Sequence, residues 1–404
     1  MTPPVILVAS LLPEHGYCGV QTHARAVSGF ARSQGYEVRL VEPHQVNRWI
    51  RRLPSLVTRM LRRLDPEKAV LWHRALAFRY LRFRLRKSLR ELEGRPVVIY
   101  AQDPLSARAA LALRHEGFDF RVIAVLHFNI SEAYEHQLNG QTREGGALWR
   151  SLMRIEQAVL PQLDKLIFVS DYMRRIVLAR NPALANVDVA VIPNFPEHAV
   201  ERAAKDQPLR ADIISIGTLE PRKNQGYLLQ VLAEAKRLGY RYRLTLAGDG
   251  PSRPEWEALA KQLGVADQVE FLGYVAGASS LLPAHRVYAH AAQMENLPLT
   301  LIEALACGLP VFAPAVGGIP EVFDDGVDGI AWLLNDATAC AEKLIEILED
   351  PRMWERMSKA ARQSYQVRFS PDVLGPQWVS AITTDLSSVE SERATSATME
   401  MKTT

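Results

Sequence analysis

The sequence has little cysteine and no long apolar run, and each absence excludes a class of protein. The three cysteines among its 404 residues, Cys18, Cys307 and Cys340, are widely spaced and odd in number. They fit neither a disulfide framework nor a zinc motif, so a reducing, cytoplasmic location is expected. No stretch reaches the roughly 18 uninterrupted apolar residues that a membrane-spanning helix needs. The first ten residues lack the basic region of a signal peptide and are expected to form a buried strand.

The composition is that of an ordinary globular protein. Hydrophobic residues make up 48% of the sequence and charged residues 23%, which excludes a largely disordered or collagen-like chain. A length of 404 residues is too great for one compact core, because domains usually have about 100–200 residues. We therefore expect two domains.

Positive charge is concentrated in one segment. Residues 48–95 contain fifteen Lys and Arg and four acidic residues, so this segment carries +11 although the whole chain carries +3. Apolar residues from Trp49 to Leu64 recur at helical spacing, and Asp65-Pro66 is a typical start of a second helix. A basic helical face indicates an anionic partner, such as nucleic acid, a phospholipid surface or a phosphorylated substrate. Solvated arginines on helices that cover a sheet would explain the composition equally well.

Alternating strands and helices predict a parallel α/β fold. Short, continuously apolar runs are typical of strands buried on both faces of a sheet. In the first half the expected strands are Pro4–Ser10, Glu37–Val41, Val97–Tyr100, Val122–Leu126, Lys165–Val169 and a run from Val189. In the second half they are Ile213–Ile216, Leu244–Ala247, Val269–Leu272, Val287–Ala289, Val311–Ala313 and Ile330–Leu333.

This pattern predicts two Rossmann-like domains of similar length with doubly wound parallel sheets. Their facing strand ends leave a cleft, where ligands of such folds bind. The polar, strand-free stretch 196–207 is the expected linker. We expect the first domain to cover residues 1–196 and the second 197–370, with a disordered Ser/Thr/Glu-rich tail at 387–404.

The most informative motif is ENLPLTLIEALACGLPV, from Glu295 to Val311. Asn296 is predicted to cap a helix whose first turn holds Pro298, and the free backbone N–H groups there suit a phosphate. Glu295 would face whatever adjoins that phosphate. Glu303, two turns inside the helix, could accept two hydrogen bonds from a vicinal diol such as a ribose. An ordinary amphipathic helix with solvated glutamates is the alternative.

A second motif, SIGTLEPRKN at residues 215–224, places Arg222 and Lys223 just after a strand. Cations near a helix start are mildly unfavourable, which favours a ligand role over a basic surface turn. No Asp-x-Asp motif occurs in the chain. If a diphosphate leaves here, these two side chains rather than Mg²⁺ would stabilise its charge, so we expect no metal and no resident cofactor.

Three weaker signals follow other strands. The stretch from Gly16 to Gly19 lets the backbone approach an anion, but it lacks the spacing of a dinucleotide-binding loop. AGDGP from Ala247 is by itself an ordinary turn. His127 follows the strand Val122–Leu126, so it is expected to face the cleft and contact a sugar or a departing phosphate. A lone histidine is more often structural.

Together these motifs resemble the retaining glycosyltransferases of family 4, which have the GT-B fold. The resemblance is strong over residues 210–335 and weaker over residues 1–200. In the second half it rests on GTLEPRKN from Gly217, AGDGP from Ala247, FLGY from Phe271, Glu295-x7-Glu303, ACGLP from Ala306 and GGIPE from Gly317. In the first half it rests on Gly19-Val20, His127, Val169-Ser170 and Ile192-Pro193-Asn194. The sequence departs from the family pattern at Cys18, Gln21, Gln102 and Thr218.

The resemblance implies a nucleotide-diphosphate-sugar donor bound mainly by the second domain and an acceptor bound by the first. It also implies metal-independent transfer with retention, and a helix at 371–386 that crosses back to the first domain. Glu303 would bind the ribose hydroxyls, and His127 would contact the donor sugar near the reacting carbon. The donor sugar and diphosphate would be held by Glu295, by Arg222 and Lys223, and by the backbone of Gly19, Gly217, Asn296, Leu297, Pro298 and Leu299.

Combined with the basic segment 48–95, the resemblance predicts transfer of a hexosyl unit to a lipid-linked saccharide. The product would be a cell-surface polysaccharide (exopolysaccharide, capsule or O-antigen), made at the inner face of the cell membrane. The basic segment would contact anionic lipid, and no nucleic acid would bind. The alternatives are a soluble sugar or sugar-phosphate acceptor, a GT-B nucleotide-sugar epimerase, and a non-catalytic nucleic-acid-binding protein. The last would leave the second half unexplained.

Overall fold

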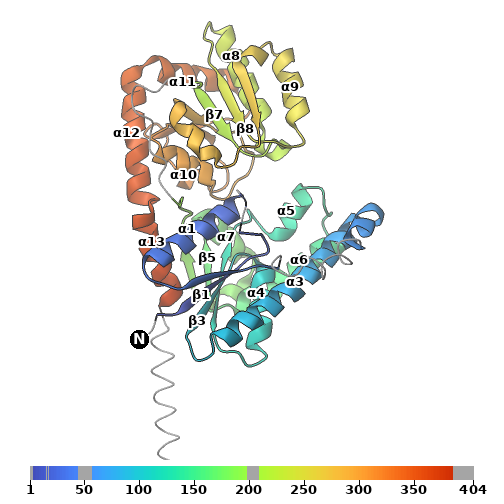
Figure 1. Cartoon of the computed structure of the whole chain (residues 1–404). Coiled ribbons are helices and arrows are strands. Elements are labelled where there is room, and N and C mark those ends of the chain that lie inside the picture. Colours follow the sequence, from blue (N-terminus) through green and yellow to red (C-terminus); the bar gives the residue numbers. More distant parts are fainter. Residues whose placement is uncertain (1–2, 15, 17, 44–56, 198–208, 385–404) are drawn as a thin grey trace, which may run out of the picture.

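The computed structural model describes residues 3–14, 16, 18–43, 57–197 and 209–384. These residues form two six-stranded sheets (Figure 1), and every pair of neighbouring strands is parallel, as predicted. The first sheet has the order β2-β1-β3-β4-β5-β6, with bounds β1 Val5–Ala9, β2 Val38–Val41, β3 Val97–Ala101, β4 Arg121–Leu126, β5 Lys165–Phe168 and β6 Val189–Val191. The second has the order β12-β11-β10-β7-β8-β9, with bounds β7 Ile213–Ile216, β8 Leu244–Ala247, β9 Val269–Gly273, β10 Val287–Ala289, β11 Val311–Pro314 and β12 Gly329–Trp332.

Helices connect the strands and pack on both faces of each sheet. In the first half they are α1 Gly19–Ser33, α3 Pro66–Glu91, α4 Pro104–Arg114, α5 Glu132–Leu138, α6 Ala147–Val159 and α7 Asp171–Arg180. In the second half they are α8 Gln225–Arg237, α9 Arg253–Gln262, α10 Leu299–Ala306 and α11 Ala337–Glu349, followed by α12 Pro351–Arg368 and α13 Pro371–Thr383. The predicted start of α3 is confirmed, because Asp65 accepts a hydrogen bond from the Lys68 N–H at 3.0 Å and Pro66 lies in the first turn.

Strand β1 shows why continuously apolar runs form strands in this fold. Successive side chains of a strand point to opposite faces of the sheet. Ile6 and Val8 pack in the cluster that contains α1 and α13, whereas Val5, Leu7 and Ala9 pack in the cluster that contains α3 and α4. All five are fully buried. Since helices cover both faces, every position in the strand must be apolar.

The chain returns to the first half through α12 and α13, drawn in red in Figure 1. The ring of Trp378 on α13 lies 5.1 Å from the ring of Tyr100 on β3, and Trp378 is fully buried. A side chain at Gly375 would place its Cβ 2.4 Å from the ring of Phe30 on α1. The absence of a side chain at residue 375 therefore allows α13 to lie directly on the first half.

Loops at the carboxyl ends of the two sheets are joined by hydrogen bonds. Glu321, after β11, accepts hydrogen bonds from the backbone N–H groups of Asp171 at 2.7 Å and Tyr172 at 2.6 Å, at the start of α7. A carboxylate is favourable at a helix N-terminus. Asn194, after β6, donates from Nδ2 to the carbonyl of Leu297 at 3.2 Å. The residues that follow the strands of one sheet thus face those that follow the strands of the other.

Several predictions concern residues outside the described ranges. They are the apolar stripe from Trp49 to Leu56, most of the expected linker and the tail from 387. The division between residues 196 and 197 stays a prediction; the two sheets lie on either side of it. Residues 57–64 are helical. No helix in the described ranges combines the length and hydropathy that crossing a bilayer requires.

Candidate active site

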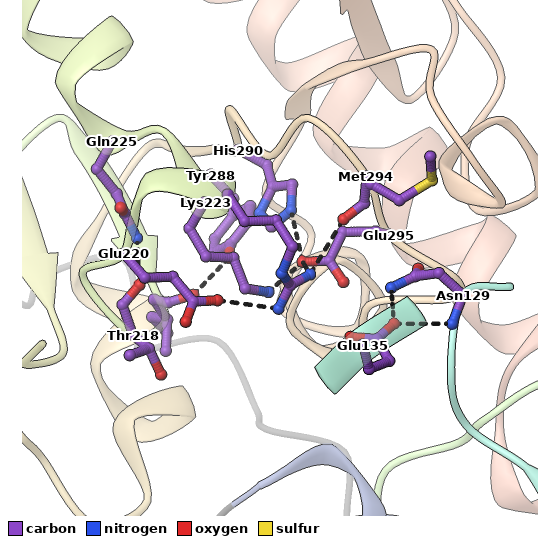
Figure 2. A network of polar contacts seen from close by, with 12 residues as sticks. Asn129, Glu135, Thr218, Glu220, Lys223, Gln225, Tyr288, His290, Met294 and Glu295 are labelled. Atoms are coloured by element: carbon purple, nitrogen blue, oxygen red, sulfur yellow. Dashed lines mark hydrogen bonds and ion pairs between the residues drawn. The ribbon is translucent and has the colours of Figure 1, made fainter. Parts of the chain in front are cut away.

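Arg222 and Lys223 are held at the carboxyl end of the second sheet. After β7 and Gly217 the chain forms a short 3-10 helix that contains both cations, and then enters α8. Asn224, between these two helices, has a φ of 53°, a left-handed conformation that asparagine adopts more readily than most residues. This turn directs the two cations toward the loop that follows β10 (Figure 2).

Glu295 is the centre of the polar network in Figure 2. Its Oε1 forms an ion pair with Lys223 Nζ and lies 3.7 Å from the Arg222 guanidinium. Arg222 also forms an ion pair with Glu220 at 2.9 Å. Burial alone would raise the pKa of Glu295, but the positive charges of Lys223 and Arg222 hold it well below its usual range. The carboxylate is therefore ionised, and three of the predicted site residues meet at one place.

His290 belongs to this network, and the motifs did not indicate it. It directly follows β10 and is 3% exposed. Its Nε2 lies 3.6 Å from Glu295 Oε1 and has no hydrogen-bond partner in the described part of the chain. Burial lowers the pKa of His290, so the ring is neutral at physiological pH. The signal that identified His127, a histidine directly after a predicted strand, could have identified this residue as well.

The prediction that Asn296 caps the helix is wrong. Helix α10 starts at Leu299 with Pro298 as its N-cap, and no side chain caps it. Asn296 is 5% exposed, and its side chain contacts the first half instead. It donates from Nδ2 to the carbonyl of Phe128 at 3.1 Å and accepts from Ser170 Oγ at 2.5 Å. The first N–H groups of α10 have no partners within the helix, as at any helix start.

Two glycines bring the loop after β11 against Glu295. Gly317 has a φ of +61°, and a Cβ at this position would lie 1.9 Å from the carbonyl oxygen of Glu295. The N–H of Gly318 donates to that same carbonyl at 3.0 Å. The glycine pair of the GGIPE motif is therefore explained by the close approach that fixes the backbone of Glu295.

Glu303 lies on α10 and is half-buried. Within the described residues no hydrogen bond or ion pair involves its carboxylate. Burial raises the pKa of Glu303 to about 7. A partly buried carboxylate without partners is costly, and a ligand that donates hydrogen bonds would remove this cost.

His127 directly follows β4 of the first sheet, whereas the network around Glu295 follows strands of the second sheet. Its Nε2 lies 3.2 Å from Gln102 Oε1, and its ring stands edge-on to His23 with 4.9 Å between centroids. Burial, followed by the neighbouring His23, keeps the pKa of His127 well below its usual value. The ring is therefore neutral. Phe128 follows, and its carbonyl contacts Asn296, so His127 adjoins the loop that carries Glu295.

Gly19 is the first residue of α1, one turn before His23. Its N-cap, Cys18, donates from its N–H to Gln21 Oε1 at 3.3 Å. Gly19 is exposed, and among the described residues no atom beyond its chain neighbours and its own helix backbone lies within 4 Å of the place that a Cβ would take. The structure thus links the start of α1 to His127 through His23 and leaves the backbone of Gly19 accessible.

The two halves of the chain match two family models. The model described as Glycosyltransferase Family 4 matches residues 17–198, and the model described as Glycosyl transferases group 1 matches residues 199–364. The chain belongs to glycosyltransferase family 4. Its two facing parallel sheets form the GT-B fold of this family.

Relatives of this glycosyltransferase differ in what their names say they act on. N-acetyl-alpha-D-glucosaminyl L-malate synthase of Bacillus anthracis is 34% identical over 136 residues, which cover 34% of this chain and 36% of that protein. The GDP-mannose-dependent alpha-(1-6)-phosphatidylinositol monomannoside mannosyltransferase of Mycolicibacterium smegmatis is 31% identical over 221 residues, covering 49% of this chain and 56% of that protein. The aligned part of this chain thus spans about a third to about half of these relatives.

A solved structure matches nearly the whole chain. Anabaena HepE in complex with UDP and glucose has a TM-score of 0.66 at 17% identity, covering 95% of this chain and 100% of HepE. This likeness shows the GT-B fold.

Proposed function

We propose that this glycosyltransferase moves a hexosyl unit from a nucleotide-diphosphate sugar to a lipid-linked saccharide, with retention and without metal, in the synthesis of a cell-surface polysaccharide. The Arg222–Lys223–Glu295 network, with the unpartnered Glu303 on the adjoining helix, carries the donor assignment. Two cations suit a diphosphate, and a free carboxylate suits a ribose diol. HepE, which has the same fold, was solved with UDP and supports a nucleotide ligand.

In this proposal the donor lies along the carboxyl end of the second sheet. Glu303 accepts hydrogen bonds from the ribose. Arg222 and Lys223 bind the diphosphate, together with backbone N–H groups of Gly19, Gly217 and residues 296–299. Both cations contact Glu295 in the ligand-free structure. A bound diphosphate therefore shares these cations with a carboxylate that is already ionised.

The proposed transfer step uses these charges. The bond between the anomeric carbon and the phosphate oxygen breaks, its electron pair stays on the diphosphate, and the acceptor oxygen bonds to the same face of the sugar. Arg222 and Lys223 stabilise the charge that grows on the diphosphate. The acceptor proton passes to the departing phosphate oxygen, so no side-chain base is needed. Glu295 stabilises positive charge at the anomeric carbon, and the neutral His127 contacts the donor sugar.

A thermal-shift series with UDP, GDP, ADP, dTDP and CDP, without metal, tests the donor assignment. We expect one diphosphate to raise the Tm by several degrees, because a ligand at about 100 times its Kd adds roughly 2.7 kcal/mol. Glu303→Ala is expected to abolish that shift. If no diphosphate at millimolar concentration shifts the Tm, the donor assignment is wrong.

Nucleotide affinity is expected to rise with pH between about 6 and 8. Glu303 has a pKa of about 7 without ligand, and only its ionised form offers two full acceptors to a ribose diol. Protonation below pH 7 therefore weakens binding, by up to about tenfold per pH unit. Titration calorimetry of the diphosphate from pH 6 to 8 measures this, with Glu303→Gln as the control. A wild-type Kd that does not change with pH would contradict the role of Glu303.

The lipid-linked acceptor is proposed from a basic arm, defined as residues 57–91, which projects from the first half (Figure 1). Part of its charge is already paired: Arg74 forms ion pairs with Glu132, and Arg82 and Arg86 with Glu116. At the start of the arm, exposed arginines stand beside exposed apolar side chains: Arg59, Arg62 and Arg63 beside Val57, Met60 and Leu64. This mixture suits the boundary between anionic headgroups and acyl chains. The M. smegmatis relative, whose name includes a phosphatidylinositol acceptor, supports this proposal.

Binding to anionic vesicles is expected to depend on Met60 and Leu64, which are 64% and 70% exposed. The variant Met60→Glu/Leu64→Glu should lose at least about tenfold in partitioning to phosphatidylglycerol vesicles, because it removes two apolar side chains that would insert between the lipids and adds two negative charges. Val327→Glu/Val367→Glu is a matched control, since it makes the same change at positions that are 53% and 60% exposed in the second half. Co-sedimentation measures both. Wild-type protein that does not bind, or binds without salt dependence, would favour a soluble acceptor.

A further inference from the structure

We propose that Asn129 and Glu135 form a subsite that binds hydroxyl groups of the acceptor sugar and rejects a ring with a phosphate beside the reacting hydroxyl. The inference rests on the proposed function and adds the chemistry of the acceptor at its reacting end. It is carried by two hydrogen-bond acceptors in the first half, near the loop of Glu295, that no residue of the described ranges uses.

The position of the pair follows from the loop between β4 and α5. Asn129 comes two residues after His127 and directly after Phe128, whose carbonyl accepts a hydrogen bond from Asn296. Figure 2 shows the pair in the same view as Glu295, with no interaction drawn between them. A group bound by Asn129 and Glu135 would therefore lie next to the donor loop, on the half that the sequence assigns to the acceptor.

Both nitrogen atoms of Asn129 donate to Glu135, whereas its side-chain oxygen has no partner among the described residues. The backbone N–H donates to Glu135 Oε1 at 3.0 Å, and Nδ2 donates to the same oxygen at 2.5 Å. Asn129 is 6% exposed, and its Oδ1 has no partner within the described residues. No hydrogen bond within those residues involves Glu135 Oε2 either. A buried polar atom without a partner is costly, and Asn129 Oδ1 is such an atom, whereas Glu135 is half-buried. Both oxygens therefore favour a ligand that donates hydrogen bonds.

The charge of the pair limits the ligand further. In the described ranges Glu135 forms no ion pair, whereas Glu132, three residues earlier on α5, is neutralised by Arg74 at 2.9 Å. A ligand that meets Glu135 must supply donors and must not carry negative charge at that point. A neutral sugar ring meets both requirements, because its hydroxyls donate hydrogen bonds and carry no charge. A sugar phosphate with its phosphate beside the reacting hydroxyl does not fit.

The variant Glu135→Gln tests the subsite with little change in shape. Its amide oxygen can still accept from Asn129, but the negative charge and one acceptor are lost. Glu93→Gln is the matched control, since Glu93 is an exposed carboxylate before β3, at the end of the sheet opposite the loops that follow the strands. Asn129→Ala is a second variant that removes the buried oxygen without changing the charge.

The assay measures nucleoside diphosphate release with four pairs of acceptors, the methyl glycosides of glucose, galactose, mannose and N-acetylglucosamine and their 6-phosphates. For at least one pair we expect wild-type kcat/KM to be at least about tenfold higher for the neutral sugar. Glu135→Gln and Asn129→Ala should raise the KM for that sugar roughly tenfold or more, because each variant loses a hydrogen bond to a charged or buried group and a loss of affinity of this order follows. In Glu135→Gln, the ratio of kcat/KM for the neutral sugar to kcat/KM for its 6-phosphate should also fall close to one. Donor KM and the diphosphate-induced Tm shift should not change, and Glu93→Gln should behave as wild type.

Three outcomes would overturn the subsite. Glu135→Gln could keep the wild-type ratio of kcat/KM between the neutral sugar and its 6-phosphate, or the wild type could prefer the phosphates. The third outcome is that a diphosphate binds but the wild type transfers to none of these acceptors. A purely structural pair would lower the Tm of Asn129→Ala without changing acceptor KM. Failure of the donor proposal is distinguishable, because then no diphosphate shifts the Tm. In that case, saturation-transfer NMR of the protein with the same sugars, without nucleotide, still tests the subsite. The subsite would be overturned if no sugar gave a signal, or if Glu135→Gln did not weaken the signal.

Discussion

Replacement of both Arg222 and Lys223 by alanine is expected to lower kcat by about 10³-fold. The two cations are positioned at the carboxyl end of β7 before substrate arrives, so they can stabilise the leaving diphosphate without reorganisation. Loss of a single preorganised group that stabilises transition-state charge costs about 10²–10³ in kcat, and two groups acting on one diphosphate are not additive. Steady-state kinetics with the donor identified by thermal shift measures this change.

The same variant should also be less stable, which gives an independent check. Glu295 is 9% exposed, and removal of both cations leaves its carboxylate without its main partners. Breaking a buried ion pair from one side costs about 3–5 kcal/mol, so urea denaturation should show a loss of that order. Arg352→Ala/Lys359→Ala on α12 is the control, because both side chains are exposed and surface ion pairs contribute little. Near-normal kcat in a folded Arg222→Ala/Lys223→Ala protein would refute the role of these cations.

Glu295→Gln is expected to lower kcat by about 10²-fold or more and to leave diphosphate affinity nearly unchanged. The carboxylate is held ionised by Lys223 and Arg222, so it presents a fixed negative charge to the sugar from which the diphosphate departs. Electrostatic stabilisation of this kind acts in the transition state and therefore appears in kcat. Because the pKa of Glu295 is lowered, its ionisation should not appear in the pH profile of kcat above about pH 5.

Glu303→Gln provides the contrast with Glu295→Gln. It removes a negative charge from the same motif, but its effect should appear in nucleotide affinity rather than in turnover. Kinetics at saturating donor and calorimetry with the diphosphate separate these two effects. If Glu295→Gln weakened diphosphate binding and kept normal turnover, Glu295 would be a binding residue and the proposed transition-state role would be wrong.

The strands, and the position of Arg222, Lys223 and Glu295 at the carboxyl end of the second sheet, could be predicted because the information is local. Arg222, Lys223 and Glu295 each follow a continuously apolar run, and the carboxyl ends of parallel strands lie at one edge of the sheet. Spacing along the chain is then enough to place such residues near one another. Glu303 lies in the predicted helix, but about one turn rather than two turns from its start, because α10 begins at Leu299.

The role of a side chain whose partners lie far away in the sequence could not be predicted from local patterns. Asn296 has the sequence properties of a helix cap, but Phe128 and Ser170 from the other sheet bind its side chain instead. The side-chain partner of a residue is decided by which loops the fold brings together, and a capping preference of about 1 kcal/mol is readily overridden.

By itself, the sequence determined two parallel α/β sheets, the cations and carboxylates that follow the second sheet's strands, and a basic segment before β3. Only the tertiary structure decided that His290 joins Glu295, that the pair Asn129 and Glu135 lies beside the donor loop, and which arginines of the arm are already paired. The reason is physical. Backbone conformation follows from nearest neighbours and hydrophobic period, whereas burial, charge pairing and unused hydrogen-bonding capacity depend on residues far away in the chain.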